Sequence, residues 1–134
     1  MNRSLLYQLP AFTLSRTVIN TMVRMVYPFL PIFGRGLEVD LRLLTLAVTI
    51  RSASGMLGPV LASVGDTRGR RAGMLFGVGL FTAGAGLMVV WPSYPAFVLS
   101  LVLGIMANFV FIPSMQAFLG DRVRYERRGL VLGM

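Results

Sequence analysis

Four long runs of apolar residues divide the chain, each close to the length that a helix needs to cross a bilayer. A helix rises about 1.5 Å per residue, so about 20 apolar residues cover a hydrocarbon core about 30 Å thick. The runs predict transmembrane helices at about residues 12–33, 41–64, 72–91 and 96–119. The segments between them are short, polar and contain glycine or proline, which is typical of tight turns between helices.

A further polar segment, residues 120–129, follows the fourth run, and only five residues come after it. Five residues cannot cross a bilayer, so we expect a fifth helix that begins at about residue 129 and a chain that is a fragment of a longer protein. The predicted fold is therefore an all-α membrane protein, a bundle of four transmembrane helices plus the start of a fifth.

The composition agrees with a membrane protein and excludes an ordinary soluble domain. Hydrophobic residues make up 55% of the chain and charged residues 13%, whereas soluble domains have about 25% charged residues. All thirteen basic residues are arginine, and they outnumber five acids to give a net charge of +8. Such a charge also occurs in nucleic-acid-binding proteins, so the placement of the arginines decides its meaning.

Arginines are unequally divided between the two sides of the predicted bundle. Eight flank one side, at positions 3, 68, 70, 71, 122, 124, 127 and 128, and two flank the other, at positions 35 and 42. Loops on the cytoplasmic side of membrane proteins carry an excess of arginine, so a cytoplasmic N-terminus is predicted. We expect the membrane to be the cell (plasma or inner) membrane. Because helices separate these arginines into different loops, binding to nucleic acid is not predicted.

Residues for enzymatic chemistry are scarce within the predicted membrane spans. The chain has no cysteine and no histidine, and its five acids all lie in or beside the connections. Metal centres, thiol nucleophiles and paired-carboxylate catalysis therefore have no candidates at membrane depth. We expect neither an enzyme nor a bound metal or cofactor.

Polar residues inside the predicted spans are the candidate site, since an arginine at the bilayer centre costs roughly 2.5–3.5 kcal/mol on insertion scales. The first helix carries a polar stripe within an arc of about 100°, made of Thr13, Arg16, Thr17, Asn20, Arg24 and Tyr27. The predicted cavity-lining residues are Arg16, Asn20, Arg24, Tyr27, Arg51 and Asn108. A structural alternative stays open, in which Arg24 or Arg51 caps carbonyl groups or bonds to Asn108 and holds the bundle together.

Small residues indicate where helices approach closely. On the second helix, Gly55 and Gly58 share a side with Arg51. The third helix carries two stripes of small residues on roughly opposite sides, one of Gly73, Gly77 and Gly84 and the other of Ala72, Gly79, Ala83 and Gly86. We therefore expect the third helix to lie between two neighbours.

The connection at residues 65–71, Gly-Asp-Thr-Arg-Gly-Arg-Arg, resembles the loop between the second and third helices of major facilitator superfamily transporters. That loop follows the pattern G-x-x-x-D-R-x-G-R-R. The residues that match its spacing are Asp66, Gly69, Arg70 and Arg71. Ala62 stands in place of the leading glycine and Thr67 in place of the first basic residue.

The end of the fourth helix carries a second resemblance, because many members have an acid followed by Arg-Gly there. Asp121 is followed by Glu126, Arg128 and Gly129. In the family such residues form cytoplasmic charge networks that hold the two halves together when the cavity faces outward. The resemblance assigns this gating role to Asp66, Gly69, Arg70, Arg71, Asp121, Glu126 and Arg128. A departure is Ser100 four residues before Gly104, where drug–proton antiporters often have arginine.

The resemblance implies helices one to four and the start of the fifth, out of the usual twelve, of an alternating-access secondary transporter. Its partners would be a small-molecule substrate, the lipid bilayer and the missing C-terminal half of the same chain. Arg24 and Arg51 at similar depth suggest a small solute that is anionic or strongly polar. Two alternatives stay open: a non-transporting membrane subunit, and a small four-helix exporter that works as an oligomer.

Overall fold

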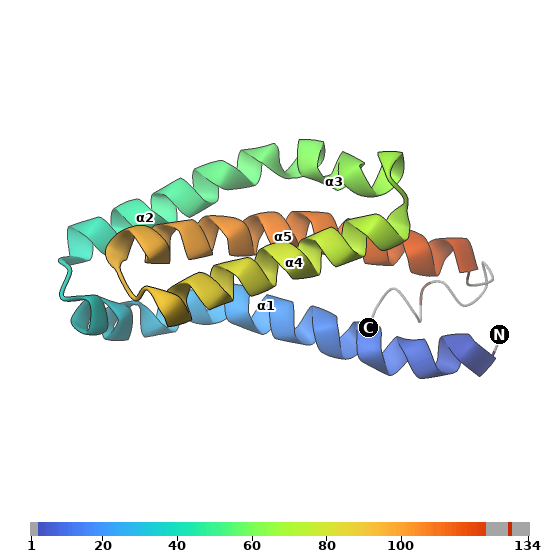
Figure 1. The fold of residues 1–134 in the computed structure, drawn as a ribbon, viewed down its shortest axis with the longest axis horizontal. Helices are drawn as coiled ribbons and strands as arrows, with labels where there is room; N and C mark the ends of the chain where they lie inside the picture. The colour runs from blue at the N-terminus through green and yellow to red at the C-terminus, as the bar shows by residue number, and fades with distance from the viewer. Residues whose placement is uncertain (1–2, 123–128, 130–134) are drawn as a thin grey trace.

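The chain folds into a bundle of long helices that run alongside one another (Figure 1). A computed structural model describes residues 3–122 and Gly129, with side chains described for 8–63, 65–122 and Gly129. The elements are α1 (Arg3–Leu37), α2 (Leu41–Ser54), the short 3-10 helix η1 (Gly55–Leu57), α3 (Gly58–Thr67), α4 (Arg70–Val90) and α5 (Tyr94–Arg122). The prediction of an all-helical chain is confirmed.

Within the described residues, three segments are long and apolar enough to cross a membrane: Leu41–Thr67, which runs through α2, η1 and α3, then α4 and α5. The first predicted span lies within α1, which has 35 residues. Because of its polar stripe, α1 is less hydrophobic on average than α4 and α5. That α1 also crosses the membrane therefore stays a prediction, supported by its position alongside α4 and α5 in Figure 1.

The turn between α1 and α2 is defined by local hydrogen bonds. Glu38 has a positive φ of 54°, and the amide of Val39 donates to the carbonyl of Gly34 at 3.0 Å, which ends α1. The side chain of Asp40 then accepts a hydrogen bond from the amide of Leu41 at 2.8 Å and caps α2. Two consecutive caps thus reverse the chain within three residues.

The second predicted helix, at 41–64, is not one regular α-helix. The 3-10 helix η1 interrupts it. Here the carbonyl of Gly55 accepts a hydrogen bond from the amide of Gly58, three residues later, whereas in an α-helix its partner is the amide four residues later. That partner would be Pro59, which has no N–H to donate. The proline explains why the helix tightens here, and the curvature of the α2–α3 segment is visible in Figure 1.

Helix α5 lies at the centre of the bundle and packs against each of the other helices, most extensively against α4. A Cβ added to Gly77 of α4 would lie 2.8 Å from the Cβ of Phe111, so the α4 backbone itself contacts α5. The predicted close approach along the stripe of Gly73, Gly77 and Gly84 is thus present. On the opposite stripe, a Cβ at Gly79 or Gly86 would meet no atom within 4 Å among the residues described.

Candidate functional site

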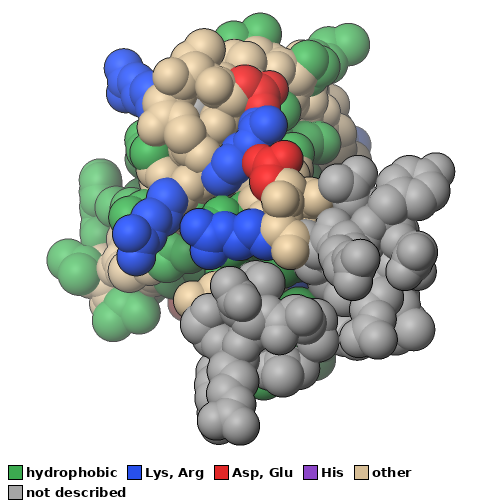
Figure 2. All heavy atoms as spheres, turned by 90° about the vertical axis from the view of Figure 1, so that its right-hand side faces the viewer, with side chains coloured by type: hydrophobic (Ala, Val, Ile, Leu, Met, Phe, Trp, Pro, Cys, Tyr) green, Lys and Arg blue, Asp and Glu red, His purple; other side chains and the backbone are tan. Residues whose placement is uncertain are grey.

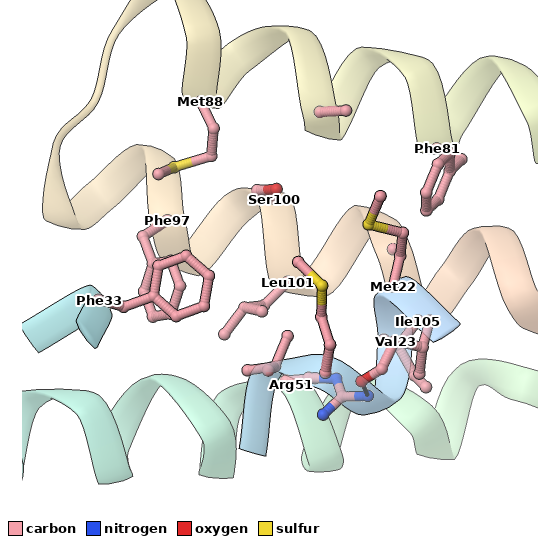
Figure 3. Close-up of a pocket in the computed structure, with 14 residues that line it drawn as sticks. Met22, Val23, Phe33, Arg51, Phe81, Met88, Phe97, Ser100, Leu101 and Ile105 are labelled. Carbon is pink, nitrogen blue, oxygen red and sulfur yellow. Dashed lines mark hydrogen bonds between the residues drawn. The ribbon is translucent and has the colours of Figure 1, made fainter. Parts of the chain in front are cut away.

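A cavity of about 190 Å³ lies among α1, α4 and α5, with one residue of α2 at its wall (Figure 3). Phe33 and Phe97 lie together at one end, with ring centroids 5.2 Å apart, and Phe81 lies toward the other end. Its lining residues are Met22, Val23, Met25, Val26, Phe33, Arg51, Phe81, Ala85, Met88, Phe97, Ser100, Leu101, Gly104 and Ile105. Most of this wall is apolar, and Arg51 is its charged member.

Helix α2 places Arg51 in the interior because of the spacing of its buried residues. Leu44, Ala47 and Arg51 are the buried residues of this helix, and their spacing of three and four puts them on one face. Ala47 is 0% exposed, so α2 comes close to the bundle at this point. The Arg51 side chain, continuing this face, enters the bundle and is only 5% exposed.

Arg51 bonds to the backbone of α1. Its Nη2 donates a hydrogen bond to the carbonyl oxygen of Val23 at 2.9 Å. Its guanidinium carbon lies 5.1 Å from the centroid of the Tyr27 ring, within the distance of a cation–π contact. The structural alternative, in which Arg51 caps a backbone carbonyl, therefore holds for Nη2, which bonds to the carbonyl of Val23.

The second terminal nitrogen of Arg51, Nη1, is buried and has no hydrogen-bond partner within the described part of the chain. Removing a cation from water costs several kcal/mol, and a single backbone bond and one ring offset only part of that cost. The described acidic side chains, Glu38, Asp40, Asp66 and Asp121, are all exposed. The Arg51 side chain is thus a buried positive charge with one terminal nitrogen that has no hydrogen bond within the described residues.

The other predicted cavity residues do not line this cavity. Arg16 and Asn20 are half-buried, Arg24 is exposed, and Tyr27 is 55% exposed. At about 100° per residue, the centre of their stripe is rotated by about 120° from the buried residues of α1, Ile19 and Val26. Asn108 is half-buried on α5 and also lies outside the cavity wall. The polar stripe therefore faces away from α4 and α5, and its role in a substrate path stays a prediction.

At one end of the bundle, arginine and aspartate side chains gather on a common surface (Figure 2). Arg70, the first residue of α4, is its centre. It pairs with Asp66, four residues earlier, and its Nε lies 3.6 Å from a carboxylate oxygen of Asp121 at the end of α5. These three residues connect the α3–α4 turn to the end of α5, and we call them the charge cluster.

Gly69 and Arg71 flank Arg70. Gly69 has a φ of 93°, a conformation that residues with a Cβ rarely adopt, and its carbonyl accepts the first bond of α4 from the amide of Gly73. Arg71 is exposed and lines a second hollow of about 520 Å³ together with Arg122. Glu126 and Arg128, the remaining predicted gating residues, lie outside the described residues, as does the predicted fifth helix apart from Gly129.

Sequence reasoning missed the apolar side of the cavity. Met22, Phe33, Phe81, Met88 and Phe97 are ordinary membrane-helix residues, and their convergence depends on how α1, α4 and α5 cross. The available signal was the spacing of Leu44, Ala47 and Arg51, which marks a buried face that ends in a charge. No group of three potential metal-ligating residues occurs within the described ranges.

Comparison with known proteins agrees with the arrangement of helices and loops. The family model described as Major Facilitator Superfamily matches residues 12–134, which is most of the chain. The chain belongs to the major facilitator superfamily. It is therefore an integral membrane protein of a transporter family rather than of an enzyme family. The charge cluster and Gly69 lie at the loops that carry the superfamily resemblance.

A curated member of the superfamily from Bacillus subtilis, named uncharacterized MFS-type transporter YwfA, is 30% identical to the chain over 110 residues. The match covers 81% of this chain and 27% of that protein, so the chain spans about a quarter of its relative's length. No solved structure matches the chain. Membership in the superfamily thus rests on sequence, and the cavity and the charge cluster are features of this chain's own fold.

Proposed function

We propose that this chain forms part of a secondary transporter that moves a small anionic solute across the cell membrane by alternating access. Its membership in the superfamily supports transport. The observation that carries the choice of an anion is Arg51, which lines the cavity, is 5% exposed and has a terminal nitrogen, Nη1, without a hydrogen-bond partner in the described chain. Charge-assisted hydrogen bonds to arginine are about twice as strong as neutral ones, so an anion is the ligand that this donor favours most.

The charge cluster supports alternating access. Its members are partly exposed, with Arg70 at 35%, Asp66 at 65% and Asp121 at 67% of the side chain. Exposed ion pairs contribute roughly 0.2–1 kcal/mol each, so the cluster can break and re-form without unfolding the bundle. We propose that it holds the cytoplasmic end closed in one state and opens in the other, with the N-terminus and the α3–α4 turn in the cytoplasm, as the arginine count favours.

The experiment is uptake by proteoliposomes that contain the protein expressed from its complete reading frame. The probes are radiolabelled acetate, lactate and benzoate, and the variants are Arg51→Gln and Arg42→Gln. Arg42 is the matched control because it lies on the same helix, is exposed and is outside the cavity wall. We expect the wild type to take up at least one of these acids. The uptake of that acid should be at least ten-fold lower with Arg51→Gln, and with Arg42→Gln it should stay within two-fold of the wild-type uptake.

Two results would overturn the proposal. Wild-type vesicles that take up none of the three acids above the level of empty vesicles would exclude a carrier of small organic anions, and would favour a non-transporting subunit. Equal uptake by wild type and Arg51→Gln, for every acid accepted, would show that Arg51 has only the structural role of capping Val23.

A further inference from the structure

The cavity wall combines one cation with an almost continuous apolar surface. Of the fourteen residues drawn in Figure 3, Arg51 and Ser100 are the polar ones. A strongly hydrophilic anion in this partly open space would lose hydration wherever it contacts the apolar wall, and each lost hydrogen bond without a replacement is unfavourable. The wall therefore favours a ligand with a charged end and an apolar body.

The size of the cavity limits that body. Pockets for drug-sized ligands have volumes of about 300–1,000 Å³, whereas this partly open cavity has a volume of about 190 Å³. A single ring fits this scale, whereas the acyl chains of a lipid do not. Met22, Met25 and Met88 lie among Phe33 and other aromatic residues. Thioether sulfurs adapt to irregular shapes and contact aromatic rings favourably, so these residues suit an aromatic body.

Tyr27 lies at the border between the cavity and the polar stripe of α1. Met22 and Val26 point to the cavity side of this helix, whereas Tyr27 belongs to the polar stripe together with Arg24. The Arg51 guanidinium contacts both sides, because it lines the cavity and lies 5.1 Å from the Tyr27 ring centroid.

Resting on the proposed function, we infer that the anion is a small aromatic monocarboxylate: its carboxylate pairs with the Arg51 guanidinium after Tyr27 moves aside, its ring occupies the 190 Å³ cavity, and Tyr27 competes for the guanidinium. In the empty protein the Tyr27 ring covers the cation, and the ligand displaces it on entry. Tyr27 is 55% exposed, so its ring has room to move outward. Tyr27 is thus a specificity-determining residue for the proposed reaction.

The test measures dissociation constants from ligand-dependent thermal stabilisation of the purified protein, expressed from its complete reading frame. The probes are benzoate, its neutral isostere benzamide, and acetate, which has the charge without the ring. We expect benzoate to bind at least ten-fold more tightly than either other probe. Arg51→Gln should weaken benzoate binding about ten-fold or more, as loss of a charged hydrogen bond requires, and leave benzamide unchanged. Arg42→Gln should match the wild type.

The Tyr27 variants give a readout that a purely structural role would not produce. Tyr27→Leu removes the cation–π contact, so benzoate should bind about two- to five-fold more tightly while benzamide does not change. Tyr27→Phe keeps the ring and should stay within two-fold of the wild type. Weaker benzoate binding by Tyr27→Leu, or an equal change for benzamide, would overturn the competition between Tyr27 and ligand.

The outcomes separate this inference from the proposed function. If acetate and benzoate bind equally and both depend on Arg51, the anion site stands and the aromatic body is wrong. If benzoate and benzamide bind equally in the wild type, the choice of an anion is wrong as well. If benzoate binding is unchanged in Arg51→Gln, the anion site is not at Arg51, and both proposals fail.

Discussion

Replacement of Gly73 by alanine tests the contact on which the centre of the bundle depends. A Cβ at Gly73 would lie 2.3 Å from the Ser114 hydroxyl and 2.9 Å from the Cα of Gly65. The hydroxyl can rotate away, but the Gly65 contact is with backbone, so α3 and α4 must move apart. Overpacking of this kind costs about 1–3 kcal/mol. Gly73→Ala should therefore destabilise the protein by about that amount.

Gly79→Ala is the matched control, on the same helix and facing away from α5. A Cβ there meets no atom within 4 Å in the described chain, and alanine in a helix interior is favoured over glycine by about 0.5–1 kcal/mol. The same gain applies at Gly73, where it offsets part of the overpacking cost, so the two variants should differ by that cost alone, about 1–3 kcal/mol. The assay is thermal unfolding of the detergent-solubilised protein. A loss of equal size at both positions would refute the reasoning, because the loss would then not depend on the contact of Gly73 with the Gly65 backbone.

Two further predictions concern the ends of the helices. Arg70→Gln should leave the free energy of unfolding within about 1 kcal/mol of the wild type, because its ion pairs are exposed, yet change the initial rate of uptake several-fold. The control Arg68→Gln, at an exposed position, should change neither quantity. Equal effects of the two substitutions would exclude a specific role for the charge cluster. Asp40→Ala should lower the free energy of unfolding by about 1 kcal/mol through loss of the α2 cap, as measured by thermal unfolding. Asp40→Asn keeps a hydrogen-bond acceptor and should cost little stability. Equal losses of stability in the two variants would contradict the capping role.

The positions of the helices could be predicted because they follow from local composition. Runs of about 20 apolar residues between polar turns place α4 and α5 to within about three residues at their ends. The interruption at η1 was not predicted, although it follows from Pro59. Proline has no N–H, so one backbone hydrogen bond of the helix cannot form, and the hydrophobicity of a segment does not reveal this. The close approach of α4 to α5 followed from Gly73, Gly77 and Gly84. A neighbour was also expected on the opposite stripe, but a Cβ at Gly79 or Gly86 meets no atom within 4 Å among the described residues.

The candidate site divides in the same way. Charge at membrane depth identified Arg51 as unusual, and the loop pattern identified Asp66, Gly69 and Asp121. The partners of Arg51 come from 24 and 28 positions earlier in the chain, and such long-range contacts depend on how α1 and α2 are rotated against each other. That rotation also decides that Arg24, at similar depth, is exposed while Arg51 is buried.

The central claim is that the buried charge of Arg51 binds the transported anion. Its most direct test is the initial rate of benzoate uptake, measured against benzoate concentration, for the wild type, Arg51→Lys and Arg51→Gln in proteoliposomes at equal protein content. Lysine keeps the charge but loses the planar fork of donors, so the account predicts a raised KM with kcat within a few-fold. Glutamine removes the charge, and uptake should fall at least ten-fold. Equal kcat/KM for all three proteins would contradict the account.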